Sequence, residues 1–543
     1  MAAGVGLMPG AAHADPVAPD THGVTVPDAD LKAASAENFK TFKSSAARSV
    51  RKNTAPAGAK ATAQAEVGNP DLAVDLAAYN ASAHSISLDT TISSVAGAWI
   101  NVVIEWGDGT TSQESSSGGS KITTTHNYEE LGTYAVKVTA TDTANNTSAD
   151  NTVEIRTAGS EFTPYGPTRL LDTRDGTGAP AAAKVRAYSS VRLKIAGNGK
   201  IPAGVTAVAL NLTVTNTRSS GHVTAFPAGT EKPNTSNVNF APGQTVPNLA
   251  IVPVGEDGYV ELYNGGWEAI DLIADATGYF TKSASSGYTP VTPIRFADTR
   301  SGLGTGKGQI IGQRGRGIQI GGANGIPAGI TAVALNVTVT NPRGDGHLTV
   351  YPSGKAVPTA SNLNFTAGQT VANSVIVPVG ADGRINIRNG AWANTDVIVD
   401  VVGYYSPASE GAYLRLKPKR VFDTRDPQDS IYGKMWGRGY IWTDFASKWP
   451  DDMGYVLNAT VTNPEGPGFL AVAPDPNYRW MYDSNSDSWP AAPTSSTLNF
   501  TADKTVANLV QASTGNTGII DFFNQSDSRI DLVVDMFGYY DRN

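Results

Sequence analysis

An Asp-Thr-Arg triplet that occurs three times is the first feature of this sequence that could do chemistry. It supplies the pairs Asp172/Arg174, Asp298/Arg300 and Asp423/Arg425. An arginine guanidinium can bind a carboxylate at two points, and Asp can bind sugar hydroxyls, so the triplet could hold a small polar ligand. The structural alternative, which we favour, is that Asp or Arg of the triplet pairs inside the fold with an acid from the end of the same copy, namely Asp275, Asp400 or Asp535.

Catalytic groups are harder to assemble from the remaining residues. Acids four positions apart recur in each copy, but on a strand they would lie about 13 Å apart, farther than the ~5–9.5 Å of glycosidase carboxylates. His222 and His347 occupy one repeat position that Phe469 takes in the third copy, which favours a role in shape or stacking. Nucleophile-elbow, zinc-protease and phosphate-loop motifs are missing from the sequence. We therefore expect no enzyme, no metal and no cofactor.

Composition narrows the remaining function classes. The 543 residues include no cysteine, which excludes disulfides and thiolate metal sites, and the net charge is −8. A dense cationic face is missing, so nucleic-acid binding is not expected. The sequence has no apolar run of the ~18–20 residues that a membrane helix needs.

The triplets belong to a triplicated module that covers most of the chain. Each copy has a long alternating strand, such as residues 205–215, and Asp-Gly or Asn-Gly hairpin turns, and almost no segment has helical periodicity. The fold class is therefore all-β. We expect three tandem antiparallel β-sandwiches of jelly-roll type at 163–282, 289–407 and 412–543.

A different pattern precedes these copies, at 68–157. It contains Trp106-Gly107-Asp108-Gly109-Thr110, then His126-Asn127-Tyr128, then an alternating run from Leu131 to Asp142. These segments resemble a polycystic-kidney-disease (PKD) domain, which implies an immunoglobulin-like β-sandwich acting as a spacer or an aid to binding. We expect Trp106 and Tyr134 in its core, and Asp108 in a turn rather than on calcium.

The triplicated module also resembles a known group. Its stretches R-L-L-D-T-R, A-L-N-V-T-V-T-N, S-N-L-N-F-T-A-G-Q-T-V and D-V-V-G-Y-Y are similar to a repeat found in secreted proteins of Streptomyces and related actinobacteria. The resemblance implies an extracellular or cell-envelope setting and no particular activity.

The N-terminal segment fits that setting. Ala12-His13-Ala14 follows a short apolar stretch, as at a signal-peptidase site, so we interpret 1–14 as a truncated signal peptide. Residues 15–67 are rich in Ala, Ser, Lys, Pro and Asp, and we expect a disordered leader or linker.

These observations predict a secreted, non-catalytic scaffold or adhesion protein, shaped as a modular rod. Its partner would be polysaccharide or cell-wall glycan, or another extracellular protein. Alternatives are an accessory binding protein of a carbohydrate-active or peptidase system, and a surface-assembly subunit. The oligomeric state stays open. Aromatic rings that could stack on sugars are Trp267, Trp392, Trp480 and Trp489, the last two in an insert of the third copy.

Overall fold

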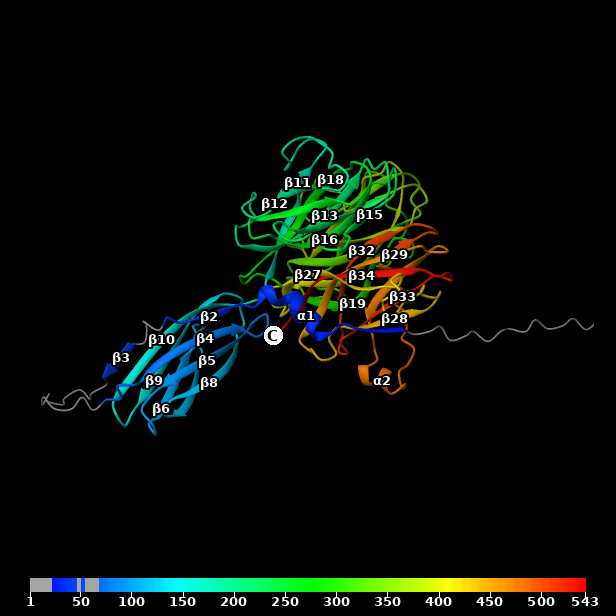
Figure 1. The fold of residues 1–543 in the computed structure, drawn as a ribbon. Coiled ribbons are helices and arrows are strands. Elements are labelled where there is room, and N and C mark those ends of the chain that lie inside the picture. Colours follow the sequence, from blue (N-terminus) through cyan, green and yellow to red (C-terminus); the bar gives the residue numbers. More distant parts are fainter. Residues whose placement is uncertain (1–21, 46–49, 54–67) are drawn as a thin grey trace, which may run out of the picture.

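The computed structural model describes residues 22–45, 50–53 and 68–543. The expected signal peptide at 1–14 lies outside the described residues. Strands dominate the remainder, which confirms the all-β fold class. An elongated sandwich formed by the first part of the chain projects from a rounded body formed by the three copies (Figure 1).

The first sandwich has two sheets, as an immunoglobulin-like domain requires. One has the order β2-β4-β5-β8 and the other β3-β10-β9-β6-β7. Trp106 is fully buried between them, and Tyr134 packs against the same core, both as predicted. The strands are β2 (Thr41–Lys43), β3 (Val50–Asn53), β4 (Ala73–Asn80), β5 (Ser85–Ser93), β6 (Trp99–Glu105), β7 (Thr111–Ser117), β8 (Ser120–Asn127), β9 (Thr133–Asp142) and β10 (Thr147–Arg156).

The prediction that residues 15–67 form a disordered leader is wrong for 22–45 and 50–53, the part of this segment that the structure describes. Besides β2 and β3, which extend the first sandwich upstream of residue 68, this part forms β1 (His22–Thr25), α1 (Asp28–Ser35) and the short 3-10 helix η1 (Ala36–Asn38). β1 adds to the third copy in parallel beside β28 (Tyr440–Asp444). The segment of β1 and α1 is ordered because Val24, Val26 and Leu31 are buried in the core of that copy.

Each copy is an eight-stranded jelly roll. In the first, the sheets have the orders β11-β18-β13-β16 and β12-β17-β14-β15, so strands one, eight, three and six face strands two, seven, four and five. The strands are β11 (Glu161–Asp172), β12 (Ser189–Lys194), β13 (Val205–Thr215), β14 (Gly221–Pro227), β15 (Val238–Phe240), β16 (Val246–Pro253), β17 (Tyr259–Asn264) and β18 (Asp271–Thr281).

The second and third copies repeat this order, and the third adds β1 at one edge and the helix α2 (Arg479–Asp483) in its insert. The second copy has β19 (Gly287–Asp298), β20 (Gly315–Gln319), β21 (Ala332–Thr340), β22 (Gly346–Pro352), β23 (Leu363–Phe365), β24 (Val371–Pro378), β25 (Arg384–Asn389) and β26 (Asp396–Ser406). The third has β27 (Ala412–Asp423), β28, β29 (Asp452–Thr462), β30 (Gly468–Pro474), β31 (Leu498–Phe500), β32 (Val506–Ser513), β33 (Ile519–Asn524) and β34 (Asp531–Asp541).

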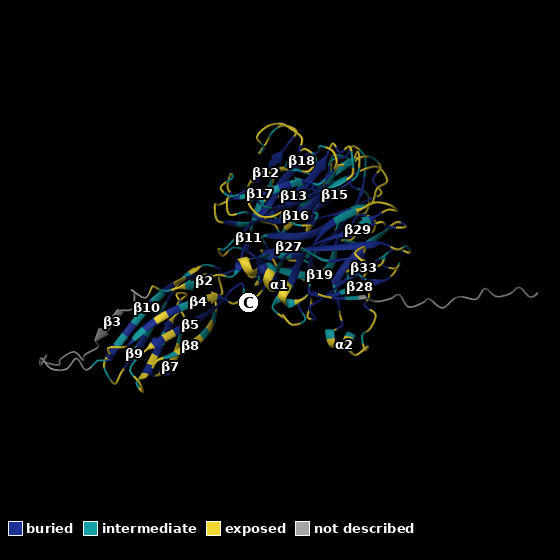
Figure 2. Ribbon diagram, viewed as in Figure 1, coloured by how far each residue is buried: buried dark blue, intermediate teal, exposed yellow. Residues whose placement is uncertain are grey.

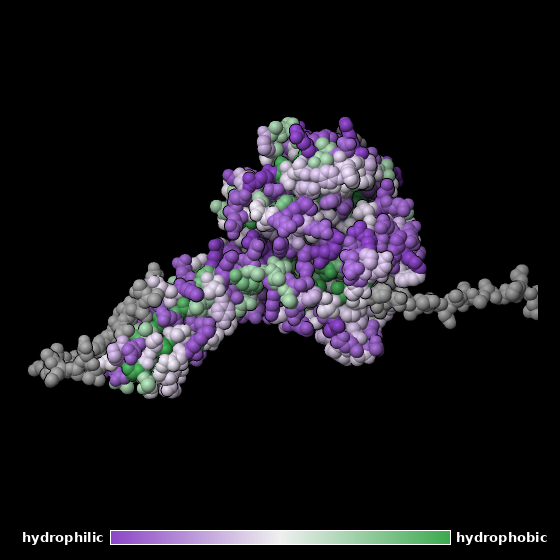
Figure 3. Space-filling view, viewed as in Figure 1, coloured by the Kyte–Doolittle hydropathy of each residue, from purple (hydrophilic) through white to green (hydrophobic). Residues whose placement is uncertain are grey.

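The three jelly rolls form a closed ring, so the expected rod is wrong. One hydrophobic cluster draws on all three copies, and its aromatic members are Phe162, Phe280, Tyr288, Tyr405, Tyr413, Phe537 and Tyr540. Phe280 of the first copy lies 4.7 Å from Tyr413 of the third and 6.4 Å from Tyr405 of the second, between ring centroids. Buried strands fill the centre of the body in Figure 2, and the face drawn in Figure 3 is mostly hydrophilic.

Asparagine hydrogen bonds run around the ring in one direction. Asn211 Nδ2 donates to Ser361 O of the second copy, Asn336 Nδ2 to Ser496 O of the third, and Asn458 Nδ2 to Ser236 O of the first. The third copy therefore returns to the first. Because these amides are buried and satisfied only across a junction, they fix how each copy meets its neighbour.

We predict that Phe280→Ala lowers the stability of the whole ring. The substitution removes a ring that contacts all three copies, and loss of a buried Phe costs about 3–5 kcal/mol. In calorimetry the unfolding transition of the body should move to lower temperature as a single unit. The matched control is Tyr432→Ala, at an exposed ring, which should change stability by about 0.5 kcal/mol or less. If only part of the body melted earlier, the copies would be independent.

Candidate functional site

The closing-strand acids pair with arginine, but not with the arginine of the triplet. Arg169 Nε lies 2.9 Å from Asp275 Oδ1, and Arg169 Nη2 lies 3.3 Å from Asp275 Oδ2. The second and third copies have the equivalent pairs Arg295–Asp400 and Arg420–Asp535, each at 2.9 Å. The acid is held by β18, β26 or β34 and the arginine by the strand beside it, β11, β19 or β27. An internal ion pair to each closing-strand acid is therefore present, but the prediction that Asp or Arg of the triplet makes it is wrong, because its cation is the first arginine of the motif.

The triplet itself closes a turn at the end of β11. Arg174 Nε and Nη2 donate to the two carboxylate oxygens of Asp172, at 2.9 and 2.7 Å, and Thr173 Oγ1 donates to Asp271 Oδ1 at 3.0 Å. The hydrogen bonds from Arg174 hold the pKa of Asp172 below its usual range. Asp298/Arg300 and Asp423/Arg425 have the same arrangement. The triplet acids are thus already occupied by their own arginines.

The first arginine of each motif also crosses to the next copy. Arg169 Nη2 donates to Thr359 O at 3.3 Å, Arg295 Nη2 to Thr494 O at 3.0 Å, and Arg420 Nη2 to Asn234 O at 3.3 Å. One side chain therefore neutralises a buried acid and joins two copies. This double contact favours the structural interpretation of the motif.

The candidate tryptophans lie at the surface. Trp267 is 76% exposed in the loop between β17 and β18, and Trp392 is 90% exposed in the equivalent loop of the second copy. Tyr188, also exposed, packs edge-on against Trp267 at 5.4 Å between centroids. Trp480 is exposed on α2, and Trp489, also exposed, contacts Tyr440 edge-on with 4.8 Å between ring centroids. The structure thus brings Trp267 and Trp392 to matching places, and Trp480 and Trp489 to a separate one.

The third copy has an aromatic residue close to the loop that corresponds to those of Trp267 and Trp392, and sequence reasoning missed this residue. Its loop between β33 and β34 has no tryptophan, but Trp436, 46% exposed, lies beside it with the Arg529 guanidinium 3.5 Å from its centroid. The bridge between Met435 and Ile530 matches that between Val185 and Ile270, and so locates Trp436 at this end of the jelly roll. Aligning the copies around these bridges would have found it. We call the three places, at Trp267, Trp392 and Trp436, the aromatic tips.

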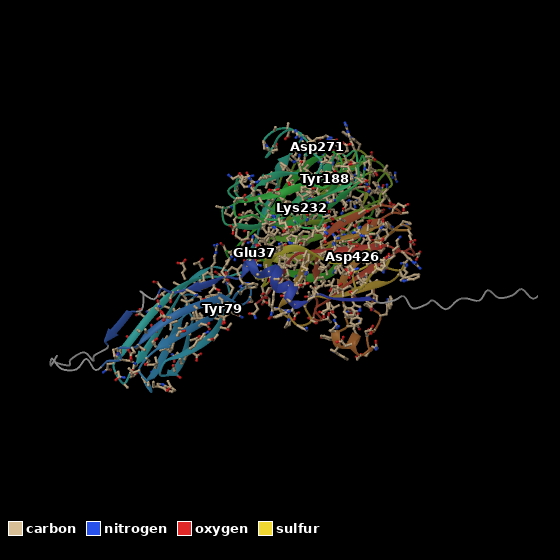
Figure 4. The ribbon with its side chains drawn as sticks, in the orientation of Figure 1. Glu37, Tyr79, Tyr188, Lys232, Asp271 and Asp426 are labelled. Atoms are coloured by element: carbon tan, nitrogen blue, oxygen red, sulfur yellow. The ribbon has the colours of Figure 1, made fainter. Side chains whose placement is uncertain are left out.

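The tips share one face of the ring. Each precedes or adjoins the start of a closing strand, at the triplet end of its jelly roll. The linkers lie at the other end, where Ser160 pairs with Tyr413 and Tyr288 with Gly411. Since β11 spans the 12 residues between these ends, about 40 Å separates them. Figure 4 shows Tyr188 and Asp271 in the upper body, far from Tyr79 of the first sandwich.

In the first sandwich, Asp108 closes a turn, as expected. Burial would raise its pKa, but hydrogen bonds from Thr110 and His126 outweigh burial and lower it to about 2. His126 Nε2 lies 2.7 Å from Asp108 Oδ2, and its ring stacks on Trp106 at 4.5 Å. Among the described residues, no group of three or more His, Asp and Glu is placed to hold a metal ion.

The first sandwich matches a known domain family. Residues 58–155 match the model of the PKD domain. The curated proteins contain no match to the chain. Nor does any described helix have the length and apolar character needed to cross a membrane.

Three solved structures resemble parts of the chain. One, entitled a structural basis for the promiscuous specificity of carbohydrate-binding modules, has 13% identity over 38% of this chain and 92% of its own, with a TM-score of 0.15. Two describe a triple jelly roll in an archaeal virus and Sulfolobus Turreted Icosahedral Virus. They have 9% and 8% identity over 70% of this chain and 90% and 91% of theirs, with a TM-score of 0.16 each. Likenesses at these scores decide nothing about function.

We predict that Arg169→Ala is far more destabilising than Arg174→Ala. The first leaves Asp275, 1% exposed, without its cation, at a cost of about 3–5 kcal/mol. The second removes a pair whose arginine is half-exposed, worth about 1 kcal/mol or less. Chemical denaturation of both variants measures the difference. Equal losses would show that the triplet, rather than the buried pair, holds the fold.

The stability that Arg169→Ala loses relative to wild type should depend on pH. Burial already raises the pKa of Asp275 while Arg169 opposes it, so Arg169→Ala raises the pKa further. A carboxyl whose folded-state pKa is raised stabilises the fold below its unfolded pKa and loses that contribution as pH rises through the folded value. The deficit of the variant relative to wild type should therefore be smaller at pH 5 than at pH 8. A deficit that grows on acidification would contradict this assignment.

Proposed function

We propose that this chain is a secreted, non-catalytic scaffold or adhesion protein that binds extracellular glycan or protein through its aromatic tips. The observation that carries the proposal is the placement of Trp267, Trp392 and Trp436 on one face of a closed ring. Each of these tryptophan side chains is solvent-exposed at the end of a rigid jelly roll. Exposed aromatic rings on a fixed frame are typical of recognition surfaces.

An extracellular setting is supported by the PKD domain, which is typical of extracellular proteins. A non-catalytic role is supported by the use of the repeated acids. Asp275 neutralises Arg169, and Asp271 accepts hydrogen bonds from Thr173 and Asn216. Carboxylates engaged in such ion pairs and hydrogen bonds have little capacity for acid–base catalysis.

The ring supports binding at several points of one long partner. A polymer that engages one tip raises the effective concentration of its neighbouring units at the other two, and linked weak sites gain 10²–10⁴ in avidity. A polysaccharide or cell-wall glycan provides such repeated units. A role as an accessory binding protein of a carbohydrate-active or peptidase system would use the same face.

Assembly through sheet edges is the less favoured alternative. In the third copy β1 covers the edge at β28. The corresponding edge strand of the first copy, β12, has Arg192 and Lys194, and cations on an edge discourage pairing with another chain.

We predict that the triple variant Trp267→Ala, Trp392→Ala, Trp436→Ala loses about 100-fold or more of its binding to bacterial cell-wall polysaccharide, because avidity fails with all three tips removed. Single variants should lose much less. Sedimentation with purified cell walls measures the bound fraction.

The matched control is Trp99→Ala, at an exposed tryptophan of the PKD domain, which should bind as wild type does. Unfolding temperatures of all variants should agree within a few degrees. If the triple variant is retained on the walls as well as wild type, the tips are not the binding face. If wild type is retained by no wall fraction, the glycan proposal is wrong.

A further inference from the structure

A cleft of about 480 Å³ opens where the third copy returns to the first. The first copy contributes His222 and the start of β15, and the third contributes Arg425 and the turn at 503–505. Pockets that hold a small ligand have about this volume. The lining of the cleft includes none of the three tip tryptophans, and it contains a residue of one Asp-Thr-Arg triplet.

Three cations line the cleft: Arg420 is paired with Asp423 and Asp535, whereas Arg425 and Lys504 have donors left over. Arg425 spends Nε and Nη2 on Asp423, which leaves Nη1 without a hydrogen bond to the described residues. The Lys504 ammonium forms no ion pair or hydrogen bond within the described part of the chain. Asp503 is the one acid among the described residues that line the cleft. An anionic group therefore has two cations available to it.

Neutral polar groups line part of the wall. Thr460 is 6% exposed, and its Oγ1 has no hydrogen-bond partner. Ser236, Asn239 and Gln244 of the first copy also line the cleft. A buried hydroxyl without a partner is costly to the fold, so a ligand hydroxyl at this place would satisfy it.

An aromatic ring completes the lining. The His222 imidazole packs so closely on Gly265 that a Cβ there would lie 2.3 Å from it. Burial lowers the pKa of His222, which keeps the ring neutral near neutral pH. A neutral flat ring beside hydroxyl and amide groups suits a sugar better than a bare anion.

The other two junctions of the ring lack this combination. The position of Lys504 holds Gln244 in the first copy and Gln369 in the second. The position of His222 holds His347 in the second copy and Phe469 in the third. Only the junction of the third copy with the first therefore has both the lysine and a histidine.

We propose that this cleft binds a uronic acid unit of an acidic polysaccharide. The sugar carboxylate lies between Lys504 and Arg425, and its ring rests on His222. Its hydroxyls contact Ser236, Asn239 and Thr460. The site needs no aromatic tip, so it can exist whether or not the tips bind glycan.

Calorimetric titration of the full chain with tetragalacturonate, and with maltotetraose as the neutral counterpart, tests this proposal. We expect the acidic oligosaccharide to bind and the neutral one to bind much more weakly. Lys504→Gln, which installs the residue of the other two copies, should weaken tetragalacturonate binding about tenfold or more, since a charge-assisted hydrogen bond is lost. Gln369→Ala, at the equivalent place of another junction, is the matched control and should bind as wild type does.

Thr460→Val is a second variant that the fold should tolerate, because Thr460 Oγ1 has no partner to lose. It should weaken binding without lowering the unfolding temperature. Equal affinity for the two oligosaccharides, or full binding by Lys504→Gln, would overturn the proposal. Acetate that binds as tightly as tetragalacturonate would overturn it too, by showing an anion site only. The triple tip variant should bind tetragalacturonate as wild type does, which separates this cleft from the proposed tip function.

Discussion

The structure depends on a single shared core. Each jelly roll buries one face of its long strand inside its own sandwich, and the other face against its neighbours. In β13 the first face carries Leu210 and Leu212, and the second carries Ala207, Ala209 and Asn211. Small residues on the second face let the backbones of three copies approach one axis. Ring closure, the junction cleft and the common direction of the tips all follow from this approach.

Alternation of apolar and polar residues was enough to predict the parts of the molecule. Strand patterns and Asn-Gly turns identified the sandwiches, and Trp106 was correctly placed in a core. The arrangement of the parts was not predictable in the same way. Asn211 has the polarity of a solvent-facing side chain, yet it is buried and donates across a junction to Ser361 O. Sequence polarity does not distinguish water from a satisfied polar interface.

The candidate site was predicted in outline and missed in detail. An arginine–aspartate pair was expected for each copy, but its cation is Arg169, which lies directly opposite Asp275 in the pairing of β11 with β18, whereas Arg174 lies beyond the end of β11. The pattern of a single sequence did not reveal this register. Trp436 was missed because it lies upstream of the loop that holds the tryptophan in the other copies. Trp436 lies in a similar place to Trp267 and Trp392 but at a different position in the repeated sequence.

The PKD domain is attached to the ring at several separate points. Asn38, between helix α1 and strand β2, donates to Arg415 O, Ala83 N donates to Asp541 Oδ2, and Ser160 pairs with Tyr413. A domain joined by one linker can move relative to its neighbour, whereas a domain held at three places keeps a fixed orientation. The PKD domain therefore has a fixed orientation relative to the ring. Whatever meets the outer end of the PKD domain, near Trp99, is held at a constant distance from whatever meets the ring.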